Sequence, residues 1–211
     1  MSTGSTGTKV GLGVLAGLVV AGIAIVLWGV GVHNALVGLD EGVKAAWAQV
    51  ENAYQRRSDL IPNLVRTVEG AADFERGTLT AVVEARSRAT SVQITPDQLT
   101  DPAALARFQE AQDALSGALS RLLVVVERYP DIKANQNFVQ LQDELAGTEN
   151  RIAIERRRFN EAAQGYNTRV RRIPDRLVAS FSGFDQATYF EAVEGADQAP
   201  AVEFTPRTDP R

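Results

Sequence analysis

The chain has 211 residues, of which 45% are hydrophobic and 23% charged, enough apolar material for one ordinary core. Its formal net charge of -4 and isoelectric point near 5.2 argue against a nucleic-acid binder, which would carry a positive excess on one face. The sequence holds no cysteine, so it has no disulfide framework, no thiolate metal site and no lipid-modified cysteine.

The strongest signal is an uncharged, apolar run from Val10 to Val32. As a helix it would be about 35 Å long, sufficient to cross a hydrocarbon core of about 30 Å with some tilt. The alternative is a secretory signal peptide, whose apolar region spans about 7 to 15 residues and ends in a small-x-small cleavage site. The nearest triplet, His33 to Ala35, fits that site poorly. We therefore predict a retained membrane anchor, with Trp28 close to one headgroup region.

Small residues form a ridge on one face of this predicted span. Gly13, Gly17, Ala21 and Ala24 lie three or four residues apart, a small-xxx-small pattern that allows two membrane helices to approach closely. Simple composition is the alternative interpretation, because glycine and alanine are common in membrane helices generally. The ridge is the candidate surface for association within the bilayer.

The charges around the span favour one orientation. Lys9 precedes the span and Lys44 follows it, which is nearly a tie under the positive-inside rule. The leader before the span carries no acid, whereas Asp40 and Glu41 come soon after it. We therefore expect the N-terminus inside and the soluble domain outside the cytoplasm.

Beyond the span, the chain is predicted to be helical with few interruptions. Apolar residues at three- and four-residue spacing run from Leu36 to Ala72, typical of one face of a long helix that continues directly out of the membrane. Pro62 removes a backbone donor and clashes with the preceding turn, so we expect a kink or a break near Ile61. The pattern resumes through residues 71–89 and stops at a polar loop.

Two further helices are predicted after this loop. Asp101 before Pro102 has the form of an N-cap followed by proline at the first helical position. Tyr129 before Pro130 ends this second helix, and the third is expected from 135 to 172. Both show a coiled-coil-like seam with alternating steps of three and four residues. The second helix has Leu105, Phe108, Gln112, Leu115, Leu119, Leu122, Val126 and Tyr129 on its seam, and the third has Phe138, Leu141, Leu145, Thr148, Ile152, Glu155, Phe159, Ala162, Tyr166, Arg169 and Ile173.

A polar minority on these seams is the unusual feature. Thr148, Glu155 and Arg169 fall on the third seam, and Arg57 lies at an equivalent level of the first helix. Because an unpaired buried charge is very costly, such residues should pair with one another or lie in shallow, wet positions. We predict that Glu155 pairs with a seam arginine such as Arg57 and fixes the register of the helices.

The residues available for chemistry argue against an enzyme. His33 is the only histidine and lies at the end of the span, so neither a di-metal carboxylate bundle, nor a zinc hydrolase, nor a serine nucleophile with a histidine base can be assembled. A phosphate-binding glycine loop is absent as well. The sequence thus predicts no catalytic residue, no metal, no cofactor and no small-molecule substrate.

Four aromatic residues mark the C-terminal block: Phe181, Phe184, Tyr189 and Phe190. Packing back onto the end of the bundle is the favoured interpretation, because large apolar patches rarely stay exposed in monomers. Capture of a partner is the alternative. An extended run is expected at 199–204.

Three segments carry a resemblance to a known family: "AWAQVENAYQRRSDLIPNLV" (46–65), "YPDIKANQNFVQLQDELAGTENRIAIERRRFNEAAQGYN" (129–167) and "FSGFDQATYFEAVEGADQAPAVEF" (181–204). In these segments the chain resembles bacterial LemA family proteins. One departure is Ile173, where a phenylalanine is common before the proline. The resemblance implies a single-pass protein of the bacterial inner membrane with a long antiparallel α-helical domain and no established catalytic activity. Family members have been linked to envelope and membrane organisation, including magnetosome formation, and to neighbourhood with membrane zinc metalloproteases.

The predicted architecture is all-α, with four parts: a leader (1–9), a transmembrane helix (10–32), an elongated bundle of three long helices (33–176) and a C-terminal appendage with its tail (177–211). Two functions remain open. The first is a membrane-anchored scaffold that forms homo-oligomers and organises the envelope, with the lipid bilayer as its partner. The second is an adaptor that recruits or regulates another membrane protein, such as a zinc metalloprotease.

Overall fold

The computed structural model describes residues 4–70 and 74–191, with side-chain surroundings from Leu12 onward, and the regular elements in these ranges are helical. The all-α fold class is confirmed. The predicted extended run at 199–204 lies outside the described residues. The elements are α1 (Gly4–Glu69), α2 (Arg76–Ser91), the 3₁₀ helix η1 (Pro96–Thr100), α3 (Pro102–Val126), α4 (Pro130–Lys133), α5 (Gln136–Arg171) and α6 (Asp175–Ser182).

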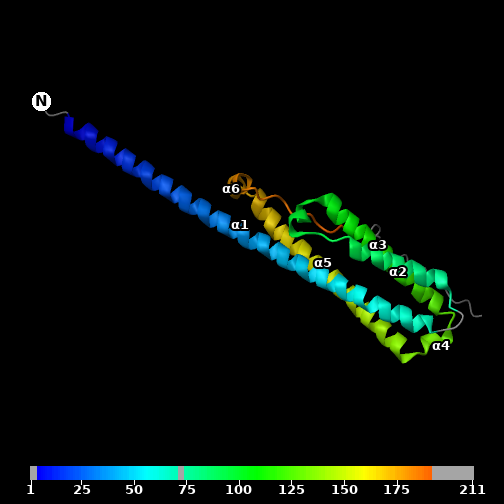
Figure 1. The fold of residues 1–211 in the computed structure, drawn as a ribbon. Helices are drawn as coiled ribbons and strands as arrows, with labels where there is room; N and C mark the ends of the chain where they lie inside the picture. The colour runs from blue at the N-terminus through cyan, green and yellow to red at the C-terminus, as the bar shows by residue number, and fades with distance from the viewer. Residues whose placement is uncertain (1–3, 71–73, 192–211) are drawn as a thin grey trace, which may run out of the picture.

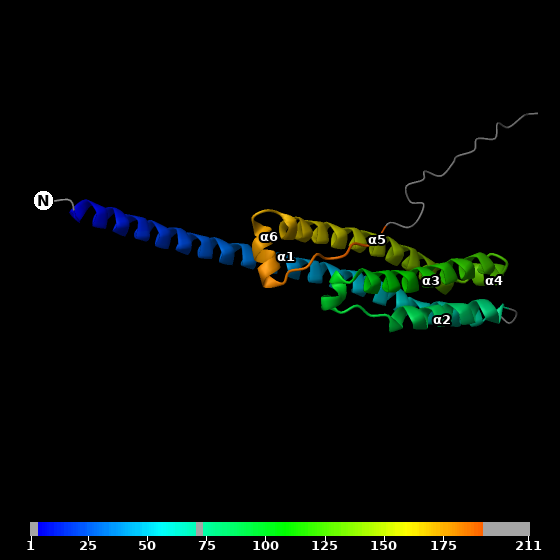
Figure 2. The same cartoon turned by 90° about the horizontal axis from the view of Figure 1, so that it is seen from above.

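Four helices lie lengthwise in an up-and-down order (Figures 1 and 2). The second half of α1 packs against α5 and α2, and α2 packs against α3. The first half of α1 extends alone beyond the bundle, as Figure 1 shows. The short helix α6 contacts both α1 and α5 at the point where α1 leaves the bundle.

The bundle contains four long helices where the sequence predicts three. Residues 76–91, expected to continue the first helix, form the separate helix α2, because α1 ends at Glu69 and the chain turns back. The face of α2 formed by Leu79, Val82, Ala85 and Ala89 is buried. Apolar spacing along one chain is the same in a continuous helix and in a helical hairpin, so the pattern alone does not locate the turn.

Of the kink or break predicted near Ile61, the break is wrong. Helix α1 runs through Pro62 without interruption. A proline at this position cannot donate to the carbonyl four residues earlier, that of Ser58. The guanidinium of Arg86 on α2 supplies the missing donor, because its Nε lies 2.9 Å from the Ser58 oxygen. The proline thereby creates an attachment point between α1 and α2.

A double-mutant cycle tests this attachment. Arg86→Met should lower the free energy of unfolding by about 1.5 kcal/mol, because it leaves a part-buried carbonyl without its charged donor. Pro62→Ala should leave the fold intact or make it slightly more stable, because an alanine restores the backbone donor. In that background Arg86→Met should cost measurably less, with the exposed Arg88→Met as control. An equal cost in both backgrounds would contradict the account.

The starts of α3 and α5 follow local capping. The Asp101 carboxylate accepts a hydrogen bond of 2.9 Å from the Ala103 backbone N–H, as its predicted N-cap role requires. Asn135 caps α5 in the same way, accepting from the Asn137 N–H at 2.9 Å. These boundaries lie within about two residues of the predicted ones, the usual precision for helix ends.

The seam predicted for α5 holds only over part of its length. From Phe138 to Phe159 most predicted positions are buried, but further on Ala163 and Val170 are buried in place of Ala162 and Arg169. A straight α-helix has 3.6 residues per turn, so it drifts by about 20° per heptad from a strict coiled-coil repeat. Ile173, the last predicted seam position, lies in the turn after α5 ends, and its side chain is exposed.

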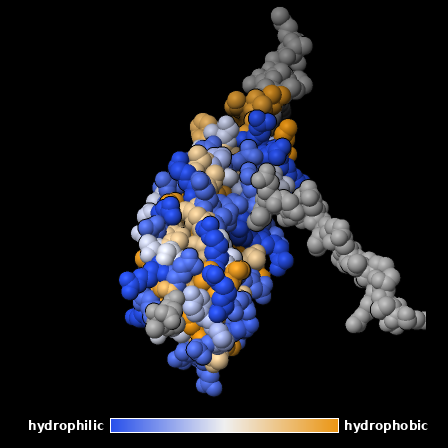
Figure 3. Space-filling model, turned by 90° about the vertical axis from the view of Figure 1, so that its right-hand side faces the viewer, coloured by the Kyte–Doolittle hydropathy of each residue, from blue (hydrophilic) through white to orange (hydrophobic). Residues whose placement is uncertain are grey.

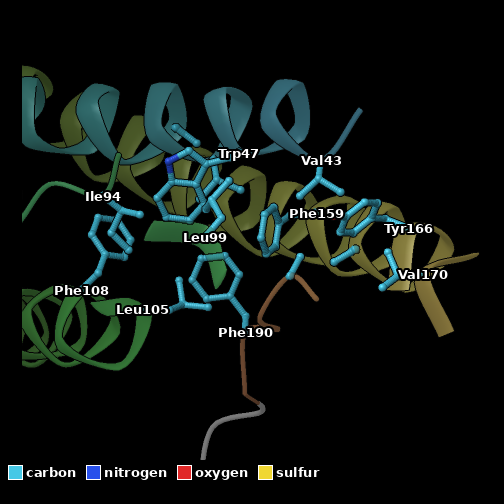
Figure 4. Close-up of a cluster of buried hydrophobic side chains, with 14 of the residues drawn as sticks. Val43, Trp47, Ile94, Leu99, Leu105, Phe108, Phe159, Tyr166, Val170 and Phe190 are labelled. Atoms are coloured by element: carbon cyan, nitrogen blue, oxygen red, sulfur yellow. The ribbon is translucent and has the colours of Figure 1, made fainter. Parts of the chain in front are cut away.

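The core fills the bundle from the end near α6 to the distal turn. Its centre is Trp47, whose ring lies 5.3 Å from Phe108, 5.6 Å from Phe159 and 5.8 Å from Phe190 between ring centroids. Figure 4 shows these rings converging from α1, α3, α5 and the C-terminal segment. A second cluster around Leu64, Leu115 and Leu122 continues the core to the far end.

Candidate functional site

The first half of α1 is the candidate membrane contact. Among the described residues, α1 is the one helix long and apolar enough to cross a membrane, by length and composition, and none of its most apolar stretch is buried. The ridge residues Gly13, Gly17, Ala21 and Ala24 are all exposed. A methyl group added at Gly13 or Gly17 would meet nothing within 4 Å. This face is therefore open to another helix.

A polar cluster around Arg57 joins all four helices of the bundle. Only 1% of this side chain is exposed. Its Nη1 donates to the Ser116 hydroxyl of α3 and to the Glu149 carboxylate of α5, both at 2.7 Å. Its Nη2 donates at 2.6 Å to the side-chain oxygen of Gln112, whose own amide donates at 3.1 Å to the Ala89 carbonyl of α2.

The contacts of the Arg57 side chain fit a structural role. The guanidinium lies 5.1 Å from the ring centroid of Tyr54, a cation–π contact. Burial raises the pKa of the Tyr54 phenol, although the charges of Arg156 and Arg57 oppose that rise. The phenol therefore stays neutral at physiological pH. The donors on both terminal nitrogens of Arg57 are engaged, so the cluster holds helices in register.

The predicted register residues are only partly brought together. Arg57 pairs with Glu149, six residues before the expected partner, Glu155. Glu155 is buried, and its carboxylate is contacted from its own helix by Arg158 at 3.0 Å and Arg151 at 3.7 Å. Arg169 is half-buried and pairs with Asp175 at the start of α6. The predicted Arg57–Glu155 pair therefore does not form. Arg57 pairs with Glu149 instead, and Glu155 pairs with arginines of its own helix.

An extended C-terminal segment, residues 184–191, which we term the strap, is held on the bundle by two asparagines of α5. The Asn167 amide accepts from the Ala187 N–H and donates to the Ala187 carbonyl, both at 2.8 Å. The Asn160 amide makes the same pair of bonds with Phe190, at 2.9 and 3.0 Å. The sequence analysis did not predict these hydrogen bonds. The available signal was the spacing of Asn160 and Asn167, two helical turns apart on one face.

Side chains and one further backbone bond complete the attachment of the strap. The Thr188 N–H donates to the Leu99 carbonyl at 2.9 Å, which joins the strap to η1. Phe190 is buried in the aromatic core, and the Arg156 guanidinium lies 4.6 Å from its ring centroid. The strap thus closes the bundle between α3 and α5.

Replacement of one asparagine tests whether these hydrogen bonds hold the strap. Asn167→Ala should lower the free energy of unfolding by about 2 kcal/mol, because it leaves the buried Ala187 N–H and carbonyl without partners. Hydrogen exchange of the Ala187 amide should become faster. Asn150→Ala, an exposed change on the same helix, is the matched control. Unchanged protection at Ala187 would show that Asn167 does not hold the strap.

The four C-terminal aromatics divide into two pairs. Phe190 is buried, and Phe184 packs on the core with its ring 5.4 Å from that of His33. Tyr189 is 42% exposed and Phe181 is 96% exposed. Phe184 and Phe190 therefore pack back onto the bundle, whereas Phe181 points away from the core.

The described residues offer little for catalysis. Within residues 4–70 and 74–191 no group of three or more histidine, aspartate or glutamate side chains lies close enough to hold a metal ion. An open cleft of about 260 Å³ between α1, α2 and α3 is lined by Glu51, Tyr54 and Gln112, among others. Burial raises the pKa of the Glu51 carboxyl in this cleft.

Comparison with known proteins finds one protein family and several individual proteins that the chain resembles. The profile of the LemA family matches residues 46–204. Magnetosome protein MamQ 2 of Paramagnetospirillum magneticum is 25% identical over 181 residues, which cover 78% of this chain and 66% of that protein. Magnetosome protein MamQ of Magnetospirillum gryphiswaldense is 26% identical over the same coverage. The match thus spans about two thirds of the length of these relatives. Protein LemA of Metamycoplasma hominis is 23% identical over 165 residues, covering 78% of this chain and 71% of that protein.

Proposed function

Because this chain belongs to the LemA family, we propose that it is a non-enzymatic, membrane-anchored scaffold that self-associates and organises the cell envelope or membrane. The observation that carries the proposal is the continuity of α1. One helix of 66 residues joins the apolar span to the four-helix bundle. At 1.5 Å per residue it is about 100 Å long.

A continuous helix fixes the bundle to the bilayer without a flexible linker. Val32 at the end of the apolar span and Leu36 and Val43 after it are already buried in the core. The bundle is therefore held at a defined height and orientation, as spacing or assembly requires. The relatives named magnetosome proteins support a role in an organised cell structure.

The hydrophilic surface of the bundle argues against assembly through non-specific hydrophobic contacts. Figure 3, which looks at the molecule from its distal end, shows a mostly hydrophilic bundle with apolar residues scattered singly. Scattered apolar residues are normal on a soluble surface. The apolar colour gathers on the part of α1 beyond the bundle.

The mass of the purified chain tests self-association. The full chain, extracted in mild detergent and measured by light scattering after gel filtration, should form one defined homo-oligomer. A monomer at all concentrations would contradict the scaffold proposal. Capture of a single different membrane protein by crosslinking in native membranes would then favour the adaptor.

The ridge on α1 has its own prediction. Gly13→Leu with Gly17→Leu should weaken the detergent-stable oligomer, because large side chains block close approach of two spans. Gly22→Leu is the matched control, because Gly22 is an equally open glycine on the opposite side of the helix. If the double variant keeps the mass distribution of the parent, assembly lies in the bundles instead.

We place the bundle outside the cytoplasm, with the span in the bacterial inner membrane. The support is Lys9 before the span and the acids Asp40 and Glu41 after it. Lys44 is paired with both acids, at 2.8 and 3.0 Å. Val124→Cys, an exposed site on α3, should react with a membrane-impermeant maleimide in intact spheroplasts. Reaction only after lysis would reverse the orientation.

A further inference from the structure

We propose that α6 is a second membrane contact, an interfacial helix that lies on the bilayer surface next to the span. The inference rests on the proposed insertion of residues 10–32 and adds a contact that the span alone does not provide. Its basis is the position, exposed apolar face and charge of α6.

The position of α6 matches the membrane boundary. It is seen nearly end-on in Figure 1 and lies across α1 in Figure 2. A helix that crosses a membrane-spanning helix in this way runs along the membrane plane. The groove between the two helices is formed by Ile25, Trp28 and His33 of α1 and by Leu177 and Phe181 of α6, among others. Ile25 and Trp28 belong to the last turns of the predicted span, so α6 lies at headgroup level.

The outer face of α6 is apolar, and the described residues leave it exposed. Leu177 and Phe181 lie four residues apart on α6 and are 70% and 96% exposed, and Ile173 in the turn just before α6 is 79% exposed. The opposite face is buried through Asp175 and Ala179. Two highly exposed large apolar side chains on one helix face, with a third just before the helix, are typical of a contact surface.

Two features show which way this face points. Leu177 and Phe181 share their groove with Ile25 and Trp28, on the side toward the apolar half of α1. At the end of this groove nearest the bundle, His33 Nδ1 lies 3.2 Å from the Ser182 hydroxyl and Phe184 packs against His33. Gly183, with a φ of 73°, ends α6 and directs the chain into the strap. The bundle therefore presents the apolar face of α6 toward the bilayer.

The charges around α6 fit an anionic lipid surface. Arg171, Arg172 and Arg176 are exposed beside the apolar face. Basic residues flanking an apolar face are the pattern of helices that lie in the headgroup region, where they attract anionic lipids. Continuity with the span identifies the bilayer as the occupant of this face, since any membrane that holds Ile25 lies beside Phe181.

Spin labels on single cysteines can test the contact, because the chain has no native cysteine. The full chain would be placed in nanodiscs at one copy per disc and labelled separately at Phe181→Cys, Leu177→Cys, Val20→Cys and Val124→Cys. Collision with oxygen, which concentrates in lipid, would be compared with collision with a water-soluble nickel chelate. Val124 is the matched control, because it is as exposed as Leu177, at 71%, but lies near the distal end of α3.

The labels at 181 and 177 should collide with the nickel chelate several-fold less than the label at 124. Phosphatidylglycerol discs should strengthen this protection relative to phosphatidylcholine discs. If the label at 20 is in lipid while that at 181 is as accessible as that at 124, the interfacial role of α6 is overturned and the span stands. If the label at 20 is also accessible, both are overturned. Protection at 181 that appears only with two copies per disc would assign the face to a second chain and overturn the lipid contact.

Discussion

Arg57→Ala is expected to lower the free energy of unfolding by about 3 to 5 kcal/mol, the range for breaking a buried charge pair. The substitution leaves Glu149, Gln112 and Ser116 without the donor that joins α1 to α3 and α5. It also leaves a cavity where a fully buried side chain stood. Chemical denaturation of the full chain in detergent, followed by circular dichroism, measures the loss.

The neighbouring residue supplies the control for this experiment. Arg56→Ala removes the same chemical group from an exposed position and should change stability by about 0.5 kcal/mol or less. Glu149→Gln keeps an acceptor for the guanidinium, so it should cost less than Glu149→Ala. If Arg57→Ala and Arg56→Ala have equal effects, the Arg57 cluster does not hold the bundle together.

Phe159→Ala is expected to have a similarly large effect for a different physical reason. Its ring is fully buried against Trp47 and Phe190, with 0% exposure. Truncation of a buried phenylalanine typically costs about 3 to 5 kcal/mol, through lost transfer energy and the cavity left behind. Thermal unfolding in detergent should show a large drop in the midpoint, and the strap amides should lose protection together with the core.

The matched variant is Phe181→Ala, the same substitution at a 96% exposed position. In detergent it should change the midpoint only slightly, because almost none of its surface is buried by protein. Equal losses from Phe159→Ala and Phe181→Ala would mean that Phe181 packs into the bundle, which the described contacts contradict.

Sequence periodicity predicts the helices and the buried residues of α3 well, because burial on one face of a helix follows from spacing alone. Leu105, Phe108 and Leu115 are buried as expected. The same reasoning loses accuracy along α5, where a strict seven-residue repeat and a straight helix diverge. The repeat places Arg169 on the seam, in a pair or a shallow position, and in the structure it is half-buried and paired with Asp175.

Contacts between helices depend on quantities that periodicity does not contain. The partner of Arg57 is set by how far α1 and α5 are shifted along each other, so an acid six residues away took the place of Glu155. Pro62 is tolerated because Arg86 approaches from α2, a helix whose separate existence the pattern did not reveal. The position of the strap could not be predicted for a related reason. Asn160 and Asn167 bind its backbone atoms, and a pattern of side chains gives no information on where those atoms lie.

The continuity of α1 has a consequence for how neighbouring copies would meet. With no hinge between span and bundle, each residue added or removed near Gly38 would turn the bundle by about 100° about the helix axis and shift it by about 1.5 Å. The number of residues between the membrane and Trp47 therefore determines which face of one bundle is directed toward its neighbour. Chains with the same bundle surface but a different count at this junction would form lattices of different geometry, or none.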